Sequence, residues 1–300
     1  MNNLKKGQVI GVVSPAGFIK DGEDLSKAIK LLESWGLKVK LGKHVFSKYK
    51  HFAGTDSQRA ADFQQFLDDD SIHGIWCARG GYGSVRLLDH LDFSKFKRKP
   101  KWIIGYSDIT VFHHVAQSIG VESIHAIMPT SLDAITESDS AKTSFRIAMF
   151  GSHLSYKFKA NNYNRIGSAS GKIVGGNLAI IASMLGSKYA LDTKGNILFI
   201  EEIGEYKYSI DRMLQSLKLN GYFEQCNGLI LGSFTNIKKN DPEFGLSIEE
   251  LVLDLVKEYD FPVCFDFKAG HIANNNALIF GRKAMLEVDQ NKVQLLFEDE

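Results

Sequence analysis

The first half of the chain alternates short apolar runs with amphipathic stretches, and no other feature of the sequence constrains the fold as strongly. The apolar runs are Val9–Val13, Leu37–Leu41, Ile72–Ala78 and Trp102–Gly105, and apolar residues at helical spacing fill Asp24–Trp35, Asp56–Leu67 and Ser84–Leu91. Strands that alternate with helices predict a parallel sheet with helices on both faces. Ligands of such sheets bind beyond the carboxyl ends of the strands. A site is therefore expected among three loops, Ser14–Phe18, Arg79–Gly83 and Tyr106–Asp108.

A second unit is predicted from Gly171 onward. Its expected helices are Asn177–Leu185, Ile210–Leu219 and Ile248–Tyr259, and its expected strands are Ile197–Ile203, Leu229–Phe234 and Val263–Phe267. Three short strands are expected in the tail, at Ala277–Phe280, Ala284–Val288 and Val293–Phe297. The turns between the tail strands suit an antiparallel sheet that closes this unit. We predict an α/β protein with an N-terminal domain over 1–150, a linker over 151–170 and a C-terminal α/β domain over 171–300. The second sheet is expected to be mixed or antiparallel.

Composition excludes several classes of function. The chain has 300 residues and a net charge of +1, which gives no reason to expect a nucleic acid or a membrane as a partner. The apolar run near the amino terminus is too short for a signal peptide, and no run approaches a membrane span. Cys77, Cys226 and Cys264 lack metal-ligand spacing and suggest reduced, buried thiols in a cytoplasmic protein. No metal and no cofactor are expected.

The loop after the fourth strand holds a candidate nucleophile, Ser107. This serine follows the strand closely, with Gly105 two residues before it and a helix behind it, so its hydroxyl would stand above the sheet edge near a positive helix end. From this segment alone a helix cap is the favoured role of Ser107, since Ser is common at such positions and the full G-x-S-x-G pattern is absent because position 109 is Ile. The choice depends on whether a base and an acid reach the same edge.

His271 is the best-placed base, because it follows a predicted strand in a loop with Gly270 and three asparagines, which suggest a fixed, hydrogen-bonded backbone. His125, at the end of a probable strand, is the second choice. The acid that would orient the base could be Glu201, Glu202 or Glu205, which follow another apolar strand. Strand alternation puts Glu201 and Glu202 on opposite faces, and periodicity does not say which one faces the site.

The loop R-G-G-Y-G at Arg79–Gly83 is either a phosphate cradle or a backbone that approaches a reacting group closely. Its glycine spacing differs from the G-x-G-x-x-G dinucleotide fingerprint, and it follows the third strand rather than the first. An oxyanion hole needs one amide beside the nucleophile and one from a neighbouring loop. The amide of Asp108 and a glycine amide of this loop could supply them.

Together these motifs resemble one family, the LD-carboxypeptidases of bacterial cell-wall recycling, with their relatives the microcin immunity proteins. The motifs that carry the resemblance are G-V-V-S-P-A-G at Gly11–Gly17, A-R-G-G-Y-G at Ala78–Gly83, G-Y-S-D-I-T at Gly105–Thr110, G-G-N-L at Gly175–Leu178, I-E-E-I-G-E at Ile200–Glu205, I-D-R-M-L at Ile210–Leu214, L-G-S-F at Leu231–Phe234 and G-H at Gly270–His271. One departure is that His125 is followed by Ala126 and Ile127, where relatives often have Gly and Pro; it concerns one wall of the pocket rather than the triad.

The resemblance implies a role for each candidate. The implied nucleophile is Ser107, the acid Glu201 and the base His271, with an oxyanion hole formed by the amides of Gly81 and Asp108. Arg79 is a candidate for binding the terminal carboxylate of the substrate, and a structural role for it is equally open.

The implied reaction is hydrolysis of the amide between an L-centre and a terminal D-amino acid, typically D-alanine, of a muropeptide tetrapeptide. Two alternatives remain: a microcin-immunity hydrolase acting on peptidyl or aminoacyl nucleotides, and a non-catalytic binding module. The expected partner is a small peptide, and a homodimer is an open option.

Overall fold

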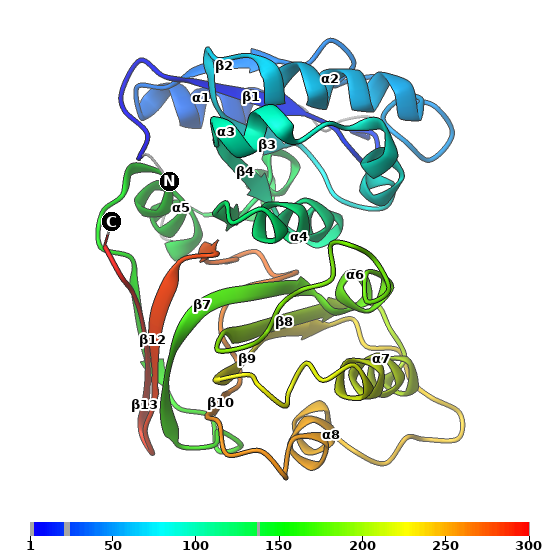
Figure 1. Cartoon of the computed structure of the whole chain (residues 1–300), viewed down its shortest axis with the longest axis vertical. Coiled ribbons are helices and arrows are strands. Elements are labelled where there is room, and N and C mark those ends of the chain that lie inside the picture. Colours follow the sequence, from blue (N-terminus) through cyan, green and yellow to red (C-terminus); the bar gives the residue numbers. More distant parts are fainter. Residues whose placement is uncertain (1–2, 21–24, 137–138, 300) are drawn as a thin grey trace.

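Two β-sheets, one above the other in Figure 1, make up the structure, a computed structural model that describes residues 3–20, 25–136 and 139–299. The predicted start of the first helix, Asp24, lies outside the described residues. The first sheet has six strands in the order β11-β5-β4-β3-β1-β2. Its strands are β1 (Val9–Val13), β2 (Lys38–Leu41), β3 (Ile72–Cys77), β4 (Trp102–Gly105), β5 (Ser123–His125) and β11 (Leu278–Phe280). All neighbours in it are parallel except β11 and β5.

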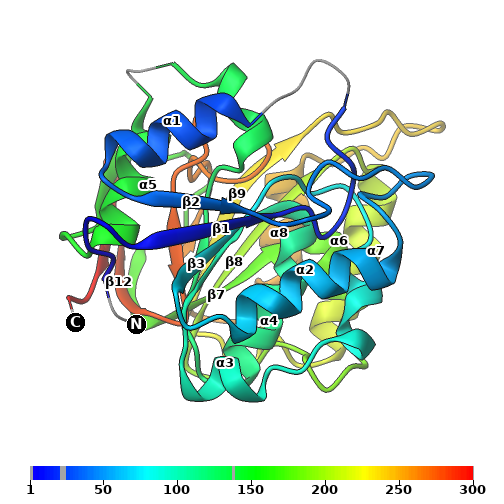
Figure 2. The same ribbon diagram turned by 90° about the horizontal axis from the view of Figure 1, so that it is seen from above.

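Helices cover both faces of this sheet, as the alternating pattern predicts. Figure 2 shows α1 on one side of β1 and α2 on the other. The helices of this half are α1 (Ser26–Ser34), α2 (Asp56–Asp68), α3 (Ser94–Arg98), α4 (Thr110–Ser118) and α5 (Ser140–Phe150), with 3-10 helices η1 (Ser84–His90), η2 (Ser107–Ile109) and η3 (Pro129–Ala134). Thr55 begins α2 with a capping box to Gln58, which satisfies amides of the first turn. The helix predicted at Ser84–Leu91 is the 3-10 helix η1 in the structure.

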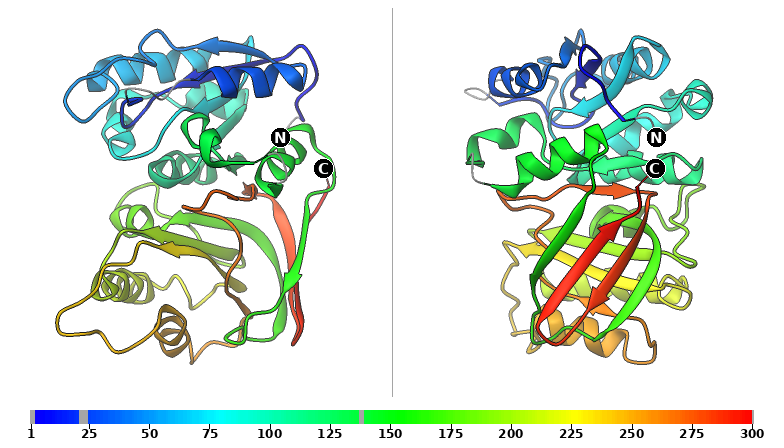
Figure 3. Two further views of the ribbon diagram at one scale, coloured as in Figure 1. Left: turned by 180° about the vertical axis from the view of Figure 1, so that it is seen from behind. Right: turned by 90° about the vertical axis from the view of Figure 1, so that its left-hand side faces the viewer.

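The second sheet is mixed, with seven strands in the order β10-β9-β8-β7-β12-β13-β6. Its strands are β6 (Ser155–Lys159), β7 (Gly167–Asn177), β8 (Ile197–Ile203), β9 (Gly228–Thr235), β10 (Val263–Cys264), β12 (Lys283–Val288) and β13 (Lys292–Phe297), and its helices are α6 (Leu178–Ser183), α7 (Lys207–Leu219) and α8 (Ile248–Leu255). The long strand β7 pairs antiparallel with β12 along its first half and parallel with β8 along its second. Figure 3 shows the red strands β12 and β13 beside the green β7. This arrangement confirms the predicted mixed sheet.

Two predicted segments take a different place in the structure. The tail strand expected to close the second unit, β11, instead pairs with β5 at the edge of the first sheet, so that prediction was wrong. Segment 151–170, expected to be a linker, contains β6 and the start of β7. Both strands pair with partners distant in sequence, which local pattern does not reveal.

One of the hydrophobic clusters joins the two halves. One cluster of buried side chains contains Trp76 and Phe145 from the first half together with Phe199 and Phe267 from the second. At the junction, Thr110 at the start of α4 accepts a hydrogen bond from the amide of Asn177 (3.1 Å), at the end of β7. A Cβ on Gly176 would lie only 2.5 Å from the Thr110 side chain, so glycine is required for this close approach. No helix in the described part of the chain is long and apolar enough to cross a membrane.

Candidate active site

The turn from β4 into η2 and α4 holds Ser107 in a strained backbone conformation. Its φ is +63°, a left-handed value that a non-glycine residue rarely adopts, and Gly105 before it has a φ of +156°. A Cβ on Gly105 would meet the Ile109 side chain at 2.9 Å, so the turn needs a glycine there. The Ser107 side chain does not cap α4, whose N-cap is Ile109. Such a tight turn keeps the serine hydroxyl at the rim, as strained functional turns do.

Ser107, His271 and Glu201 form a hydrogen-bonded chain. His271 Nε2 lies 2.9 Å from Ser107 Oγ, and His271 Nδ1 lies 2.6 Å from Glu201 Oε2. The glutamate is fully buried, whereas the histidine side chain is 14% exposed. A carboxylate only accepts hydrogen bonds, so Nδ1 carries the imidazole proton and Nε2 offers its lone pair to the serine hydroxyl. This arrangement can remove the hydroxyl proton of Ser107.

The two neighbouring glutamates of β8 have different environments. Between the pairs Ile200–Leu231 and Glu202–Phe234, one residue of β8 lies opposite two of β9, which is a β-bulge. Glu201 lies at this bulge and bonds His271. Glu202 accepts hydrogen bonds from the amides of Ala179 (2.8 Å) and Ile203 (2.7 Å) and from the Asn177 side chain (3.1 Å), so it anchors the start of α6. Burial raises the pKa of Glu202.

The loop that carries His271 is held by asparagine side chains, as its sequence predicts. Asn275 Oδ1 accepts a hydrogen bond from the Gly270 amide (2.8 Å), and Asn274 Oδ1 accepts one from the amide of Ala141 at the start of α5 (2.8 Å). Asn276 accepts one from the Ser140 hydroxyl (2.6 Å). The short strand β10 ends at Cys264, before the predicted Phe267, so this loop is longer than expected. Its fixed backbone positions the imidazole.

His125, the second-choice base, lies beneath the site and does not reach Ser107. It is fully buried, packs against Phe199 with ring centroids 5.2 Å apart, and has Nε2 3.3 Å from Asn275 Oδ1. Burial, with His113 and His271 nearby, holds the pKa of His125 well below its usual range. His125 thus supports the loop of His271 through Asn275.

Glycines of the Arg79–Gly83 loop lie directly against the serine. A Cβ on Gly80 would be 3.1 Å from Ser107 Cβ and 3.2 Å from its Oγ, so Gly80 permits this approach; the sequence did not single it out. The Gly80 carbonyl accepts a hydrogen bond from the Gly17 amide (3.1 Å). Because a trans peptide directs its N–H opposite to its carbonyl, the Gly81 amide points away from Gly17. The loop therefore presents backbone close to the serine hydroxyl.

The side chain of Asp108 stabilises this loop through a hydrogen bond at the end of the loop. Asp108 is buried, and its Oδ2 accepts a hydrogen bond from the Ser84 amide at the start of η1 (2.8 Å). Burial raises the pKa of the Asp108 carboxyl. Arg59, also buried, donates to the carbonyls of Pro15 and of Gly83 (3.0 Å). The sequence did not predict the role of the Asp108 side chain or of Arg59. A lone arginine in a helix gives no signal that it is buried.

Tyr106, directly before Ser107, is influenced by charges on both sides of the site. Burial and the nearby Glu201 carboxylate raise the pKa of Tyr106 to about 12, an effect opposed by the positive charge of Arg79. The Tyr106 ring packs edge-on against the His271 ring, with centroids 5.0 Å apart. The positive charge of Arg79 is therefore felt at Tyr106, the residue before Ser107.

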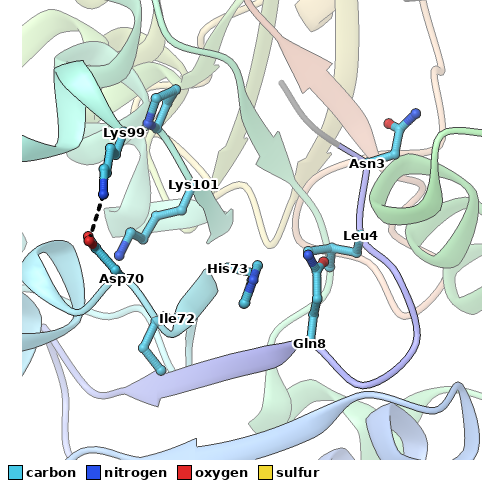
Figure 4. A pocket seen from close by; sticks show the side chains of 9 residues that line it. Asn3, Leu4, Gln8, Asp70, Ile72, His73, Lys99 and Lys101 are labelled. Carbon is cyan, nitrogen blue, oxygen red and sulfur yellow. Dashed lines mark hydrogen bonds and ion pairs between the residues drawn. The ribbon is translucent and has the colours of Figure 1, made fainter.

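A hollow at the amino ends of the strands of the first sheet has no part in this site. It is lined by residues at the amino ends of the strands, which Figure 4 shows: Asn3, Leu4, Gln8, Asp70, Ile72, His73, Lys99, Pro100 and Lys101. Lys101 donates to the carbonyls of Phe66 (2.8 Å) and Asp69 (2.7 Å) at the end of α2, where a cation offsets the helix dipole. Its role there is structural.

Sequence comparison assigns the chain to a family. The LD-carboxypeptidase N-terminal domain matches residues 10–126, and the LD-carboxypeptidase C-terminal domain matches residues 170–286. The probable murein peptide carboxypeptidase of Bacillus subtilis is 34% identical over 287 residues, which span 94% of this chain and 90% of the relative. The chain belongs to the LD-carboxypeptidase family.

Solved structures share the fold of this LD-carboxypeptidase family member. The muramoyltetrapeptide carboxypeptidase of Oxalobacter formigenes superimposes with a TM-score of 0.86 at 29% identity, covering 97% of this chain and 99% of its own. The microcin immunity protein MccF, in complex with glutamyl sulfamoyl guanosine, gives a TM-score of 0.87 at 22% identity, covering 99% and 98%. The second likeness is one of fold alone.

Proposed function

We propose that this chain is a serine LD-carboxypeptidase in which Ser107 is the nucleophile, His271 the base and Glu201 the residue that orients the base. The observation that carries the proposal is the hydrogen-bonded chain from Ser107 Oγ through His271 to Glu201, with distances of 2.9 and 2.6 Å. The substrate is a muropeptide tetrapeptide, and the bond cleaved joins an L-centre to the terminal D-alanine. The names of the Bacillus and Oxalobacter relatives support this substrate class.

The first half of the reaction forms an acyl-enzyme. His271 Nε2 takes the proton of Ser107 as its oxygen attacks the carbonyl carbon, and Glu201 stabilises the imidazolium that forms. The imidazolium then gives its proton to the amine of D-alanine, which leaves. In the second half, water loses a proton to the same nitrogen and hydrolyses the acyl-enzyme, which releases the tripeptide and restores Ser107.

Backbone amides of Asp108 and Gly81 are the proposed donors to the tetrahedral oxyanion. Gly80 permits the loop to lie against Ser107, which supports the assignment of the following amide. One such donor contributes about 3 kcal/mol to transition-state stabilisation. Arg79, whose charge reaches Tyr106, is the proposed partner of the terminal carboxylate of the substrate. Cell-wall recycling and a homodimeric assembly remain predictions from the family resemblance.

Mass spectrometry of two substrates tests the proposal. The protein is incubated with a muramoyl tetrapeptide and, separately, with an aminoacyl sulfamoyl nucleotide, with Ser107→Ala as the control. We expect loss of D-alanine from the tetrapeptide, and no loss in the variant. Cleavage of the nucleotide alone would favour the microcin-immunity activity, and cleavage of neither would favour a binding module.

A further inference from the structure

One oxygen of the Glu201 carboxylate has no hydrogen-bonding partner in the triad. Oε2 is bonded to His271, whereas Oε1 is fully buried and has no partner among the described residues. A buried charge is costly unless both of its oxygens are hydrogen-bonded. A donor close to Oε1 would therefore lower the cost of keeping this glutamate ionised and would fix its rotation.

Ser233 is a buried hydroxyl that lies near the Glu201 carboxylate and could supply such a donor. It lies in the β9 bulge opposite Glu201, between Leu231 and Phe234. Its Oγ is buried and has no partner in the described chain. A Cβ built on Gly270 would be 2.5 Å from Ser233 Oγ and 2.8 Å from both Cβ and Oε2 of Glu201. The two side chains therefore lie against the same side of Gly270, where one water could bridge their oxygens.

We propose that Ser233 is a positioning residue that donates its hydroxyl proton, directly or through one water, to the Glu201 carboxylate. The inference rests on the proposed function, since it concerns the acid of that triad. It also gives the bulge a purpose: the extra residue of β9 places Ser233 beside the acid, and the Ser233 amide is held by the Ala269 carbonyl (2.9 Å) of the His271 loop.

The expected effect of Ser233→Ala follows from the place of Glu201 in the proposed triad. Without the hydroxyl the carboxylate is freer to rotate, so its hydrogen bond with His271 Nδ1 is weaker. The downfield NMR signal of the Nδ1 proton should then broaden or move upfield. Looser orientation of the acid should also lower kcat roughly tenfold with little change in KM.

The NMR signal of the His271 Nδ1 proton, together with kcat and KM for the tetrapeptide, tests this in the full-length protein. The variants are S233A, S233T, which keeps the hydroxyl, and S118A, which removes a hydroxyl that donates to Val115 O (2.7 Å) at the far end of α4. S233T and S118A should keep the wild-type signal and rate. An unchanged Nδ1 proton signal in S233A, with or without a fall in kcat, would overturn the proposal, as would an equal change of the signal in S233T.

Failure of the proposed function is separable from failure of this inference. A wild-type protein that cleaves no tetrapeptide would refute the proposed function, yet the NMR signal of its His271 Nδ1 proton would still report on Ser233. A wild-type protein that cleaves the tetrapeptide while S233A matches it in rate and NMR signal would refute the role of Ser233 alone.

Discussion

The two halves of the site are built in different ways. Ser107 comes from a single local turn, in which β4, Gly105 and the start of α4 follow one another in the chain. Glu201 and His271 come from separate elements that meet through a β-bulge and a loop tied by asparagines. The shape of the local turn is set mainly by consecutive residues, so it should tolerate distant changes better than the rest of the site does. The acid and base depend on tight contacts across the chain, and their geometry should be easier to break.

Replacement of each of the two histidines at the site by alanine should give the largest difference between variants. His271→Ala should nearly abolish covalent labelling of Ser107 by a serine-directed reagent, because a hydroxyl without its base is a poor nucleophile. His125→Ala should still be labelled, though more slowly, since His125 supports the loop through Asn275. Mass spectrometry of the labelled protein measures both. Full labelling of His271→Ala, with loss in His125→Ala, would place the base in the first half.

The neighbouring glutamates give the next largest contrast. Glu201→Gln should lower kcat by about 10³- to 10⁴-fold, because an amide facing His271 Nδ1 favours the wrong tautomer of the base. Glu202→Gln should keep most of the turnover, since Glu202 bonds the start of α6 rather than the histidine. Steady-state kinetics on the tetrapeptide decide between them. The reverse order would move the acid to Glu202.

Two glycines test how tightly the acid is packed. Gly270→Ala should lower kcat roughly 100-fold, because its new Cβ would collide with Glu201 and Ser233 and displace the acid. The matched control is Gly204→Ala, at the end of the same β8 strand: Gly204 has a similarly positive φ (+77°) but nothing within 4 Å of its Cβ. Equal losses in the two variants would show that backbone strain, and not crowding of Glu201, limits activity.

Asp108→Asn in the local turn should have the smallest effect on turnover, because the proposed mechanism uses the amide of Asp108 and an asparagine oxygen can still accept from Ser84. Stability should depend on pH instead. Because burial raises the pKa of Asp108, its contribution to stability is present at low pH and is lost as the pH rises through the folded-state pKa. The free energy of unfolding of the variant should therefore increase relative to that of the wild type as the pH rises. Urea unfolding at several pH values measures this; a constant difference would contradict it.

The same contrast explains what the sequence could predict. Ser107 was found from consecutive residues, and the four strands before it from their apolar runs, because both signals are local. The choice between Glu201 and Glu202 depends on a bulge set by two strands, which alternation along one strand cannot reveal. The resemblance to a family singled out Glu201, and the structure brings that residue to His271.

Other differences have the same origin. The tail strand β11 was assigned to the wrong sheet because its partner, β5, is more than 150 residues earlier in the chain. Gly80 was overlooked beside Gly81 because glycines in a run look alike until one of them touches a side chain. The support that Ser84 and Asp108 give each other likewise joins two loops that sequence periodicity treats separately.

The pairing of β11 with β5 orders events during synthesis. A ribosome makes β5 long before β11, so a nascent chain that already contains Ser107 and Glu201 still has an open β5 edge and no His271. Unpaired edges invite association with other chains. The edge is sealed only when Leu278–Phe280 has emerged, shortly after the base itself. The residues of the candidate site are therefore completed, and the β5 edge is covered, at nearly the same point of synthesis.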